Sequence, residues 1–248
     1  MKIVHSANLV KALQLTQVGF VPTMGALHEG HLALVKEAKK ECPQVVVSIF
    51  VNPTQFNDPN DLKHYPRNLE SDCQLLKEAG VDVVFAPDPT EIYNDDFRYR
   101  VSESQISQIL CGPFRPGHFE GVLTVVLKLL QIVNPKKAYF GEKDYQQLVL
   151  IKEMAKAFFL PCEIIGCPTI READGLALSS RNLRLSPQER ENAALMFKAL
   201  THSKNIDETK QALSTAGFKV DYVEEHWGRR FAAAYLGNVR LIDNVELT

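Results

Sequence analysis

The stretch VGFVPTMGALHEGHLALV, Val18 to Val35, contains the change of pattern that decides the fold. It begins with VGFVP, a short apolar run whose β-branched and aromatic side chains are typical of a buried strand. A polar segment with two glycines and two histidines follows. From His31 onward the apolar residues Leu32, Val35 and Ala38 fall on one helical face. The stretch therefore predicts a buried strand, a turn and an amphipathic helix.

The same alternation continues along the chain. Apolar runs of strand length lie at 44–51, 81–87, 137–141 and 162–168, and helical patterns lie at 69–79 and 122–133. Gly80 and the Asn-Pro pair after Val133 are typical of helix ends. Strands that alternate with helices predict an α/β fold with a Rossmann-like, doubly wound parallel sheet. Sheets of this kind bind ligands where strands end and loops begin.

The pattern changes near Ser186. The sequence SPQE, Ser186 to Glu189, has the residues of a capping box with proline at the first helical position, which predicts a helix over 187–200. We expect a second helix after it, and then two strands in FKVDYVEEHW and RFAAAYLGNVRLIDN. We therefore predict one domain over 1–178, followed by a hinge loop and a small C-terminal α+β domain over 179–248.

Composition and charge favour a small-molecule partner. The 248 residues are 45% hydrophobic and carry a net charge of −2, without the basic excess that nucleic-acid binding requires. No segment reaches the roughly 18 apolar residues of a membrane span, and the N-terminus does not resemble a signal peptide. The odd number of cysteines, without C-x-x-C spacing, suits reduced thiols. We expect a cytoplasmic protein that binds neither membrane nor nucleic acid; its cysteines are Cys42, Cys73, Cys111, Cys162 and Cys167.

The glycines and histidines of the turn fit a phosphate site better than other motifs. A Walker A loop would need Lys and Ser or Thr where His31 and Leu32 stand, and a dinucleotide loop would need glycine at Leu27. The histidines are three residues apart, whereas zinc proteases place theirs four apart. A helix N-terminus attracts anions through its unpaired N–H groups, and two imidazoles would add donors. The alternative is that His28 caps a turn and His31 is an ordinary surface residue.

Five motifs, in order between about Gly19 and Asn182, carry a resemblance to a known family. They are PTMGALHEGH, SIFVNPTQF, RPGHFEGV, FGEKDYQQL and DGLALSSRN, and LIDN follows at 241–244. Together they resemble the pantoate:β-alanine ligases of coenzyme A biosynthesis, members of the H-x-G-H nucleotidylyl-transferring group. The resemblance implies that ATP and (R)-pantoate form pantoyl adenylate and pyrophosphate, and that β-alanine then displaces AMP to give pantothenate. It also implies Mg²⁺ with the ATP and a homodimer.

The resemblance also implies the site residues. His28, His31, Lys143 and Arg181 match catalytic positions, and His31 matches the family's proton donor. Gln55 and Gln147 match pantoate-binding positions, with Gln55 also touching β-alanine, and Asp144 matches a residue near the ribose that could also help to seat Mg²⁺. The other positions that match ATP-binding residues are Met24, Gly25, Ala26, Leu27, Glu29, Gly30, Gly141, Glu142, Ile170, Leu178, Ser179 and Ser180.

Two departures and two alternatives accompany this hypothesis. Thr54 stands where the family usually has methionine, and the region after Ser186 is shorter than is usual in the family. A relative that transfers a nucleotidyl group to a phosphorylated substrate is one alternative, although Gln55 and Gln147 suit a hydroxylated carboxylate better. A non-catalytic nucleotide-binding regulator is the other, although such a protein would be expected to have lost some of these residues.

Overall fold

The computed structural model describes residues 1–247 and confirms the strand, turn and helix expected at its centre. Strand β2 is Val18–Thr23, and helix α2 is Glu29–Glu41. The other elements as far as residue 167 are β1 (Lys2–Val4), α1 (Ala7–Ala12), β3 (Gln44–Ile49), α3 (Pro59–Lys63), α4 (Leu69–Glu78), β4 (Val83–Phe85), α5 (Pro89–Ile92), α6 (His118–Val133), β5 (Lys137–Gly141), α7 (Tyr145–Ala157) and β6 (Glu163–Cys167).

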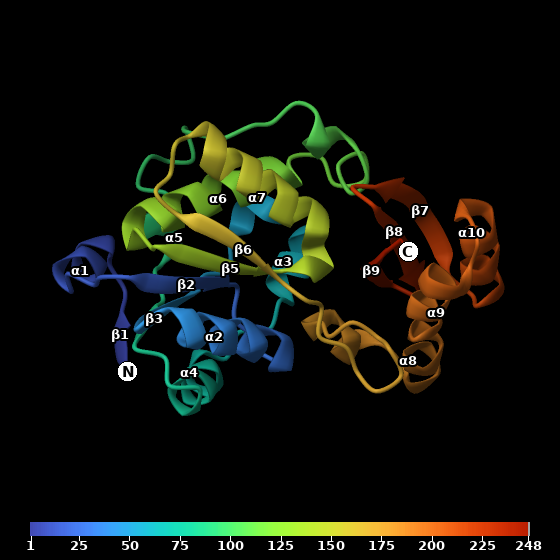
Figure 1. Cartoon of the computed structure of the whole chain (residues 1–248), viewed down its shortest axis with the longest axis horizontal. Helices are drawn as coiled ribbons and strands as arrows, with labels where there is room; N and C mark the ends of the chain where they lie inside the picture. The colour runs from blue at the N-terminus through green and yellow to red at the C-terminus, as the bar shows by residue number, and fades with distance from the viewer. Residues whose placement is uncertain (248) are drawn as a thin grey trace. The chain divides into compact units, whose positions relative to one another are not determined.

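The central sheet has six parallel strands in the order β1-β4-β3-β2-β5-β6. Helices α2 and α4 lie on one side of it, and α6 and α7 lie on the other (Figure 1). The chain runs outward from β2 in one direction through β3 and β4, and in the other through β5 and β6. The order of strands therefore reverses between β2 and β5, which confirms the doubly wound sheet. The carboxyl end of β2 lies at this switch point.

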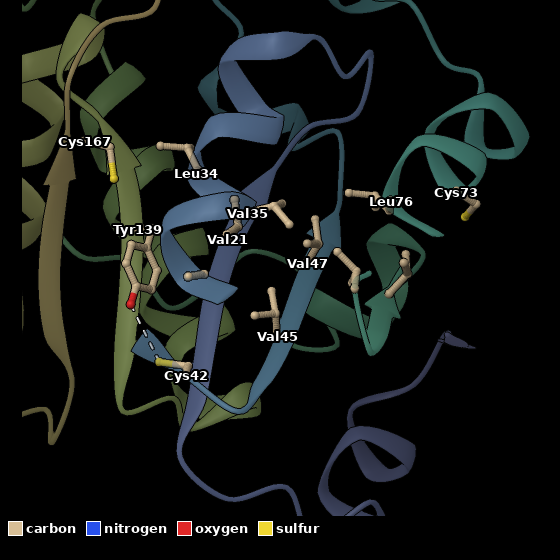
Figure 2. Packing of buried hydrophobic residues seen from close by; sticks show 13 residues of the cluster. Val21, Leu34, Val35, Cys42, Val45, Val47, Cys73, Leu76, Tyr139 and Cys167 are labelled. Carbon is tan, nitrogen blue, oxygen red and sulfur yellow. Dashed lines mark hydrogen bonds between the residues drawn. The ribbon is translucent and has the colours of Figure 1, made fainter. Parts of the chain in front are cut away.

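The core between the sheet and α2 is apolar and closely packed (Figure 2). Val45 and Val47 of β3 are fully buried, as expected for strands covered on both faces. The phenol of Tyr139 also enters this core, where its hydroxyl donates to Glu41 Oε2 at 2.7 Å and lies 3.7 Å from Cys42 Sγ. Burial raises the pKa of Tyr139, so the phenol stays protonated and remains a donor.

The chain forms two compact units. The first comprises Met1–Glu142 and Gln146–Cys167, and the second comprises Lys143–Tyr145 and the residues from Pro168 onward. The second unit contains helices α8 (Pro187–Ala193), α9 (Leu195–His202) and α10 (Ile206–Thr215) and an antiparallel sheet of strands β7 (Lys219–His226), β8 (Arg229–Leu236) and β9 (Val239–Glu246). It has its own buried cluster, which includes Leu176, Met196 and Leu213.

The segment between Pro168 and Leu178 packs with the second unit, whereas the sequence-based division fell after residue 178. Its anchor is Arg171, whose guanidinium donates to both carboxylate oxygens of Asp243, at 2.6 and 2.9 Å. The same guanidinium lies 4.1 Å from the ring centroid of Phe197. Such bidentate pairs are among the stronger polar contacts in proteins, and this one ties the segment to β9.

Several predicted element boundaries after residue 117 were wrong. The helix expected over 187–200 is two helices, because Ala194 ends α8 and begins α9. The capping box at Ser186 and Glu189 is confirmed. The strand expected over 230–244 is the hairpin of β8 and β9, which turns at Gly237 with a φ of +56°. Helix α6 also begins earlier than expected, after Gly117 in the left-handed region.

Among residues 1–247, none of the helices combines the length and the apolar character that crossing a membrane requires.

Candidate functional site

The turn between β2 and α2 is held by a buried carboxylate. Asp72, in the first turn of α4, is only 3% exposed. Its Oδ2 accepts from the Ala26 amide at 3.0 Å, and its Oδ1 accepts from the Leu27 amide at 2.8 Å. Gly25 and Ala26 both have positive φ, 79° and 52°, so this backbone is unusual for a non-glycine residue. The Asp72 carboxylate stabilises this turn by accepting a hydrogen bond from each of the two amides.

His28 and His31 form a capping box at the start of α2. His28 Nδ1 accepts from the Gly30 amide at 3.1 Å, and His31 Nδ1 accepts from the His28 amide at 3.3 Å. The two ring centroids are 4.2 Å apart. Because both Nδ1 atoms act as acceptors, the neutral rings carry their protons on Nε2. The helix cap therefore selects the tautomer in which each histidine has an Nε2–H donor.

The backbone amides of the turn are committed to the protein itself. Gly25 donates to Thr23 Oγ1 at 3.2 Å, Ala26 and Leu27 donate to Asp72, and His28 and Gly30 donate to the two imidazoles. The sequence suggested that unpaired amides here would receive an anion. In this structure those amides donate within the protein, and the imidazoles bring Nε2–H donors to the same turn. His28 is thus both a helix cap and a candidate ligand.

Gln55 is positioned by the start of α6. It ends a short turn, Pro53–Gln55, that follows β3. The Gln55 carbonyl accepts from His118 Nδ1 at 2.8 Å and from Arg115 Nη2 at 3.3 Å. A Cβ at Gly121 would lie 2.6 Å from the carbonyl oxygen of Thr54, so only glycine permits this approach. Arg115, His118 and Gly121 belong to the RPGHFEGV motif, and the sequence alone indicated no role for them.

The two adjacent glutamines of α7 have different surroundings. Gln146 is buried, and its Nε2 donates to the carbonyls of Ile106 and Ile109, each at 2.8 Å. Its Oε1 accepts from the Cys111 amide at 3.1 Å, so this side chain holds the preceding loop. Gln147 is half-buried, and among residues 1–247 its amide has no hydrogen-bond partner. Gln147 thus remains the candidate ligand of the pair.

In the second unit, β9 holds the backbone of Lys143. The Lys143 carbonyl accepts from Asn244 Nδ2 at 3.0 Å, and Asn244 Oδ1 accepts from Arg229 Nε at 2.6 Å. The Arg229 guanidinium lies 4.5 Å from the ring centroid of Tyr145. Lys143 Nζ is 3.7 Å from Asp144 Oδ2. The LIDN motif, whose role the sequence left open, therefore supplies the side chain that positions Lys143.

The segment with Ser179 and Arg181 also lies in the second unit. The Leu178 amide donates to the Ile170 carbonyl at 3.0 Å, and Ser179 Oγ accepts from the Arg181 amide at 3.3 Å. Asn182 Nδ2 donates to the Ala177 carbonyl at 3.0 Å. These bonds form the turn that opens a short 3₁₀ helix, Ser180–Arg184. The predicted ATP-binding residues thus divide into a group in the first unit, 24–31 with 141–142, and a group in the second.

The cysteines show no sign of catalytic chemistry. Burial raises the pKa of the Cys162 thiol to about 12 and that of Cys167 to about 11, so both stay protonated near neutral pH. A thiolate is the reactive form of cysteine, so a nucleophilic role is disfavoured. Within the part of the chain that the structure describes, no group of three or more histidine, cysteine or acidic side chains could hold a metal ion.

We predict that Asp72→Asn loosens the turn before the histidines. The substitution removes charge-assisted hydrogen bonds and turns one amide N–H₂ group toward a backbone donor, which should cost about 1.5–3 kcal/mol. Hydrogen exchange at the Ala26 and Leu27 amides should accelerate strongly. Glu70→Gln, in the same helical turn but exposed, is the matched control and should change neither amide. If both amides are protected from exchange as strongly in the Asp72 variant as in the unmodified protein, the carboxylate does not hold the turn.

The known proteins that this chain resembles belong to one family. Residues 2–246 match the family model described as pantoate-beta-alanine ligase. A pantothenate synthetase from Bdellovibrio bacteriovorus is 56% identical over 93% of this chain and 92% of its own length. One from Coxiella burnetii is 51% identical over 96% of this chain and 92% of its own length.

Solved structures show the same fold. Pantothenate synthetase from Thermus thermophilus is 43% identical with a TM-score of 0.94, over 99% of both chains, so the length of the present chain is shared by that relative. Pantoate-beta-alanine ligase from Francisella tularensis, solved in complex with beta-gamma ATP and beta-alanine, is 46% identical with a TM-score of 0.94, over 99% of this chain and 97% of its own. The chain therefore belongs to the pantoate-β-alanine ligase family and is an enzyme that joins pantoate to β-alanine.

Proposed function

We propose that the enzyme forms pantothenate through a pantoyl-adenylate intermediate. In the first step a carboxylate oxygen of (R)-pantoate attacks the α-phosphorus of ATP, and the bond from that phosphorus to the bridging oxygen breaks to release pyrophosphate. In the second step the amine of β-alanine attacks the acyl carbon, loses a proton and displaces AMP. The observation that carries the proposal is the pair of Nε2–H donors at the switch point of the sheet. The beta-gamma ATP and beta-alanine bound to the Francisella ligase support it.

The histidines would act mainly on the adenylation step. Negative charge builds on the phosphate oxygens as pyrophosphate leaves, and preorganised donors stabilise that charge without reorganising. His28 and His31 have the tautomer for this, because their Nδ1 atoms are held by the helix cap. General-acid help from His31 to the leaving pyrophosphate is the more specific form of the proposal. It would require His31 as an imidazolium, which gives its Nε2 proton to pyrophosphate and keeps the proton on Nδ1, so the hydrogen bond from the His28 amide would be released.

The cations of the second unit would neutralise the triphosphate. Lys143 supplies a compact ammonium on a backbone that Asn244 holds. Arg181, which follows Ser179 and Ser180 in the sequence, supplies a guanidinium. We propose the remaining predicted ATP-binding residues as further nucleotide contacts.

Pantoate would be held by the glutamines of the first unit. Gln55 and Gln147 are neutral, so they can orient a hydroxylated carboxylate without neutralising the nucleophile. Gln55 would also contact the incoming β-alanine.

Mg²⁺ would enter with ATP. Asp144 lies beside the Lys143 ammonium, and we propose an ion held chiefly by the phosphate oxygens of ATP, with Asp144 helping to seat it. We further propose a cytoplasmic homodimer, which equilibrium sedimentation would test; its five free cysteines suit a reducing compartment.

We also propose that the C-terminal residues, 179–248 in the sequence-based division, act as a hinge loop and lid. An acyl adenylate is a mixed anhydride that water attacks, so the enzyme needs to exclude water until the amine arrives. Gly175 supports a defined conformation just before this region. Its φ is +97°, and a Cβ there would lie 2.3 Å from Phe197 Cδ1.

Isotope exchange should identify the first step. With pantoate present and β-alanine absent, labelled pyrophosphate should exchange into ATP, and the complete reaction should release AMP. Chelation of Mg²⁺ should stop the exchange. Release of ADP, or exchange that does not depend on pantoate, would contradict the adenylate mechanism.

Substitution of the phosphate donors should slow adenylation. We expect His31→Ala and Lys143→Ala each to reduce its rate roughly 10²-fold to 10³-fold, the scale for one preorganised donor, with the fold intact. Single-turnover kinetics with ATP and pantoate measure this step. The exposed residues His202 and Lys152 provide matched controls as alanine variants. If the Lys143→Ala enzyme also fails to join preformed pantoyl adenylate to β-alanine, the proposal that the lysine acts in the adenylation step is contradicted.

The lid proposal predicts uncoupled AMP release when the segment before it is disturbed. With ATP and pantoate alone, Gly175→Ala should release AMP beyond one equivalent per site faster than the unmodified enzyme, because the intermediate meets water. Gly217→Ala is the control, since Gly217 has a similar φ of +88° but open space around it. If both variants release AMP at the rate of the unmodified enzyme, the lid proposal is wrong.

A further inference from the structure

A chain of hydrogen bonds links two hydroxyl groups to the side chain of Gln55. Tyr93 OH donates to Asn52 Oδ1 at 2.6 Å, and Thr54 Oγ1 donates to the same oxygen at 3.0 Å. The two hydroxyls lie 3.1 Å apart. On its other side, Asn52 Nδ2 donates to Gln55 Oε1 at 2.9 Å. Asn52 is only 1% exposed, so its amide has no access to water as an alternative partner.

The orientation of the Asn52 amide follows from its chemistry. Its Nδ2 also lies 3.1 Å from the carbonyl oxygen of Gly121, which can only accept. The nitrogen must therefore face Gly121 and Gln55, and the oxygen must face the two hydroxyls. Burial raises the pKa of the Tyr93 phenol, so the hydroxyl keeps the proton that it donates.

This orientation determines which half of the Gln55 amide is available. Because Gln55 Oε1 accepts from Asn52, the group left for another partner is the Nε2–H₂ donor. The carboxylate and hydroxyl oxygens of pantoate are acceptors that such a donor suits. A neutral glutamine could otherwise present either its oxygen or its nitrogen to a ligand.

We propose that Thr54 and Tyr93 are positioning residues that act through Asn52 to present the Gln55 amide nitrogen to pantoate. The inference rests on the proposed role of Gln55 in pantoate binding. Both hydroxyl donors favour the one orientation of the Asn52 amide that the Gly121 carbonyl also favours, so together they help to hold the Gln55 amide in one state. The usual methionine of the family could not donate at position 54. Here Thr54 adds a second donor beside Tyr93, and this is a feature of the present chain.

A cavity next to these hydroxyls provides a matched control. It has a volume of about 180 Å³ and is lined by Thr54, Tyr93 and Tyr99, among other residues. Tyr99 is 71% exposed, and its hydroxyl takes no part in the bonds to Asn52. Tyr99→Phe therefore removes a phenol hydroxyl from a residue that lines the same cavity and leaves the bonds to Asn52 complete.

The test compares kinetic constants for two substrates. Tyr93→Phe and Thr54→Val should each raise the KM for pantoate about threefold to tenfold, the scale of one hydrogen bond, and change the KM for ATP and kcat less than about twofold. Thr54→Ser should restore the KM, and Tyr99→Phe should not change it. Since KM does not depend on the fraction of folded enzyme, partial misfolding of a variant does not obscure the comparison of the two KM values. Equal increases in both KM values, or no rescue by serine, would overturn the proposal.

A second pair of variants separates this inference from the proposed function. If the hydroxyls act through Gln55, Tyr93→Phe should have no further effect on the KM for pantoate in a Gln55→Ala background. If Gln55→Ala raises this KM but Tyr93→Phe and Thr54→Val do not, the positioning proposal fails and the role of Gln55 stands. If Gln55→Ala leaves the KM unchanged, the role of Gln55 fails, and the positioning proposal fails with it.

Discussion

The two hydrogen bonds from the Ala26 and Leu27 amides to Asp72 are the constraint on which the first unit's candidate site depends. The backbone that leaves β2 must turn sharply to enter α2, and it does so through two consecutive residues with positive φ. Amides in such a turn need acceptors, and burial makes the need stronger. A carboxylate from α4 supplies both. With the turn held in this way, His28 falls at the helix cap and His31 lies one turn along the same helix.

The commitment of these amides has a chemical consequence. A helix start usually offers its backbone N–H groups to an anion. Here most of the N–H groups of the turn already donate hydrogen bonds to Thr23, Asp72 and the two imidazoles. The histidines satisfy the helix through Nδ1, and that leaves the proton on Nε2. Each imidazole therefore caps the helix through Nδ1 and, in the proposed function, donates to phosphate through Nε2. The alternative of His28 as a cap and the hypothesis of a phosphate ligand are compatible.

Each unit positions its candidate residues through contacts that are distant in sequence. In the first unit, the start of α6 approaches the turn that carries Gln55 so closely that Gly121 cannot have a side chain. In the second, Asn244 of β9 holds the carbonyl of Lys143, and Arg171 ties the segment before Ser179 to the same strand through Asp243. Side-chain amides, a carboxylate and a guanidinium serve here because each can satisfy backbone or charged groups that burial would otherwise leave without partners.

The sequence by itself determined the central strands, the order of strand and helix, and the residues of the family's motifs. Apolar runs such as Val18–Pro22 and Gln44–Val51 are local signals, and the capping box at Ser186 is another. The pattern could not separate β8 from β9, because the apolar character continues through the turn at Gly237.

Only the tertiary structure decided the roles of Asp72, Asn52 and Tyr93. In the sequence Asp72 is an ordinary acidic residue in the first turn of a helix, and Tyr93 is an aromatic residue in a loop. Their partners lie 46 and 41 residues away. A hydrogen bond across such a distance leaves no periodic pattern along the chain, since it depends on how α4 lies against the turn after β2 and how the end of α5 lies against the segment after β3. The chemical nature of the motif residues could be predicted from the local sequence. Which of their donor and acceptor atoms face a ligand could not, because that depends on partners distant in the sequence.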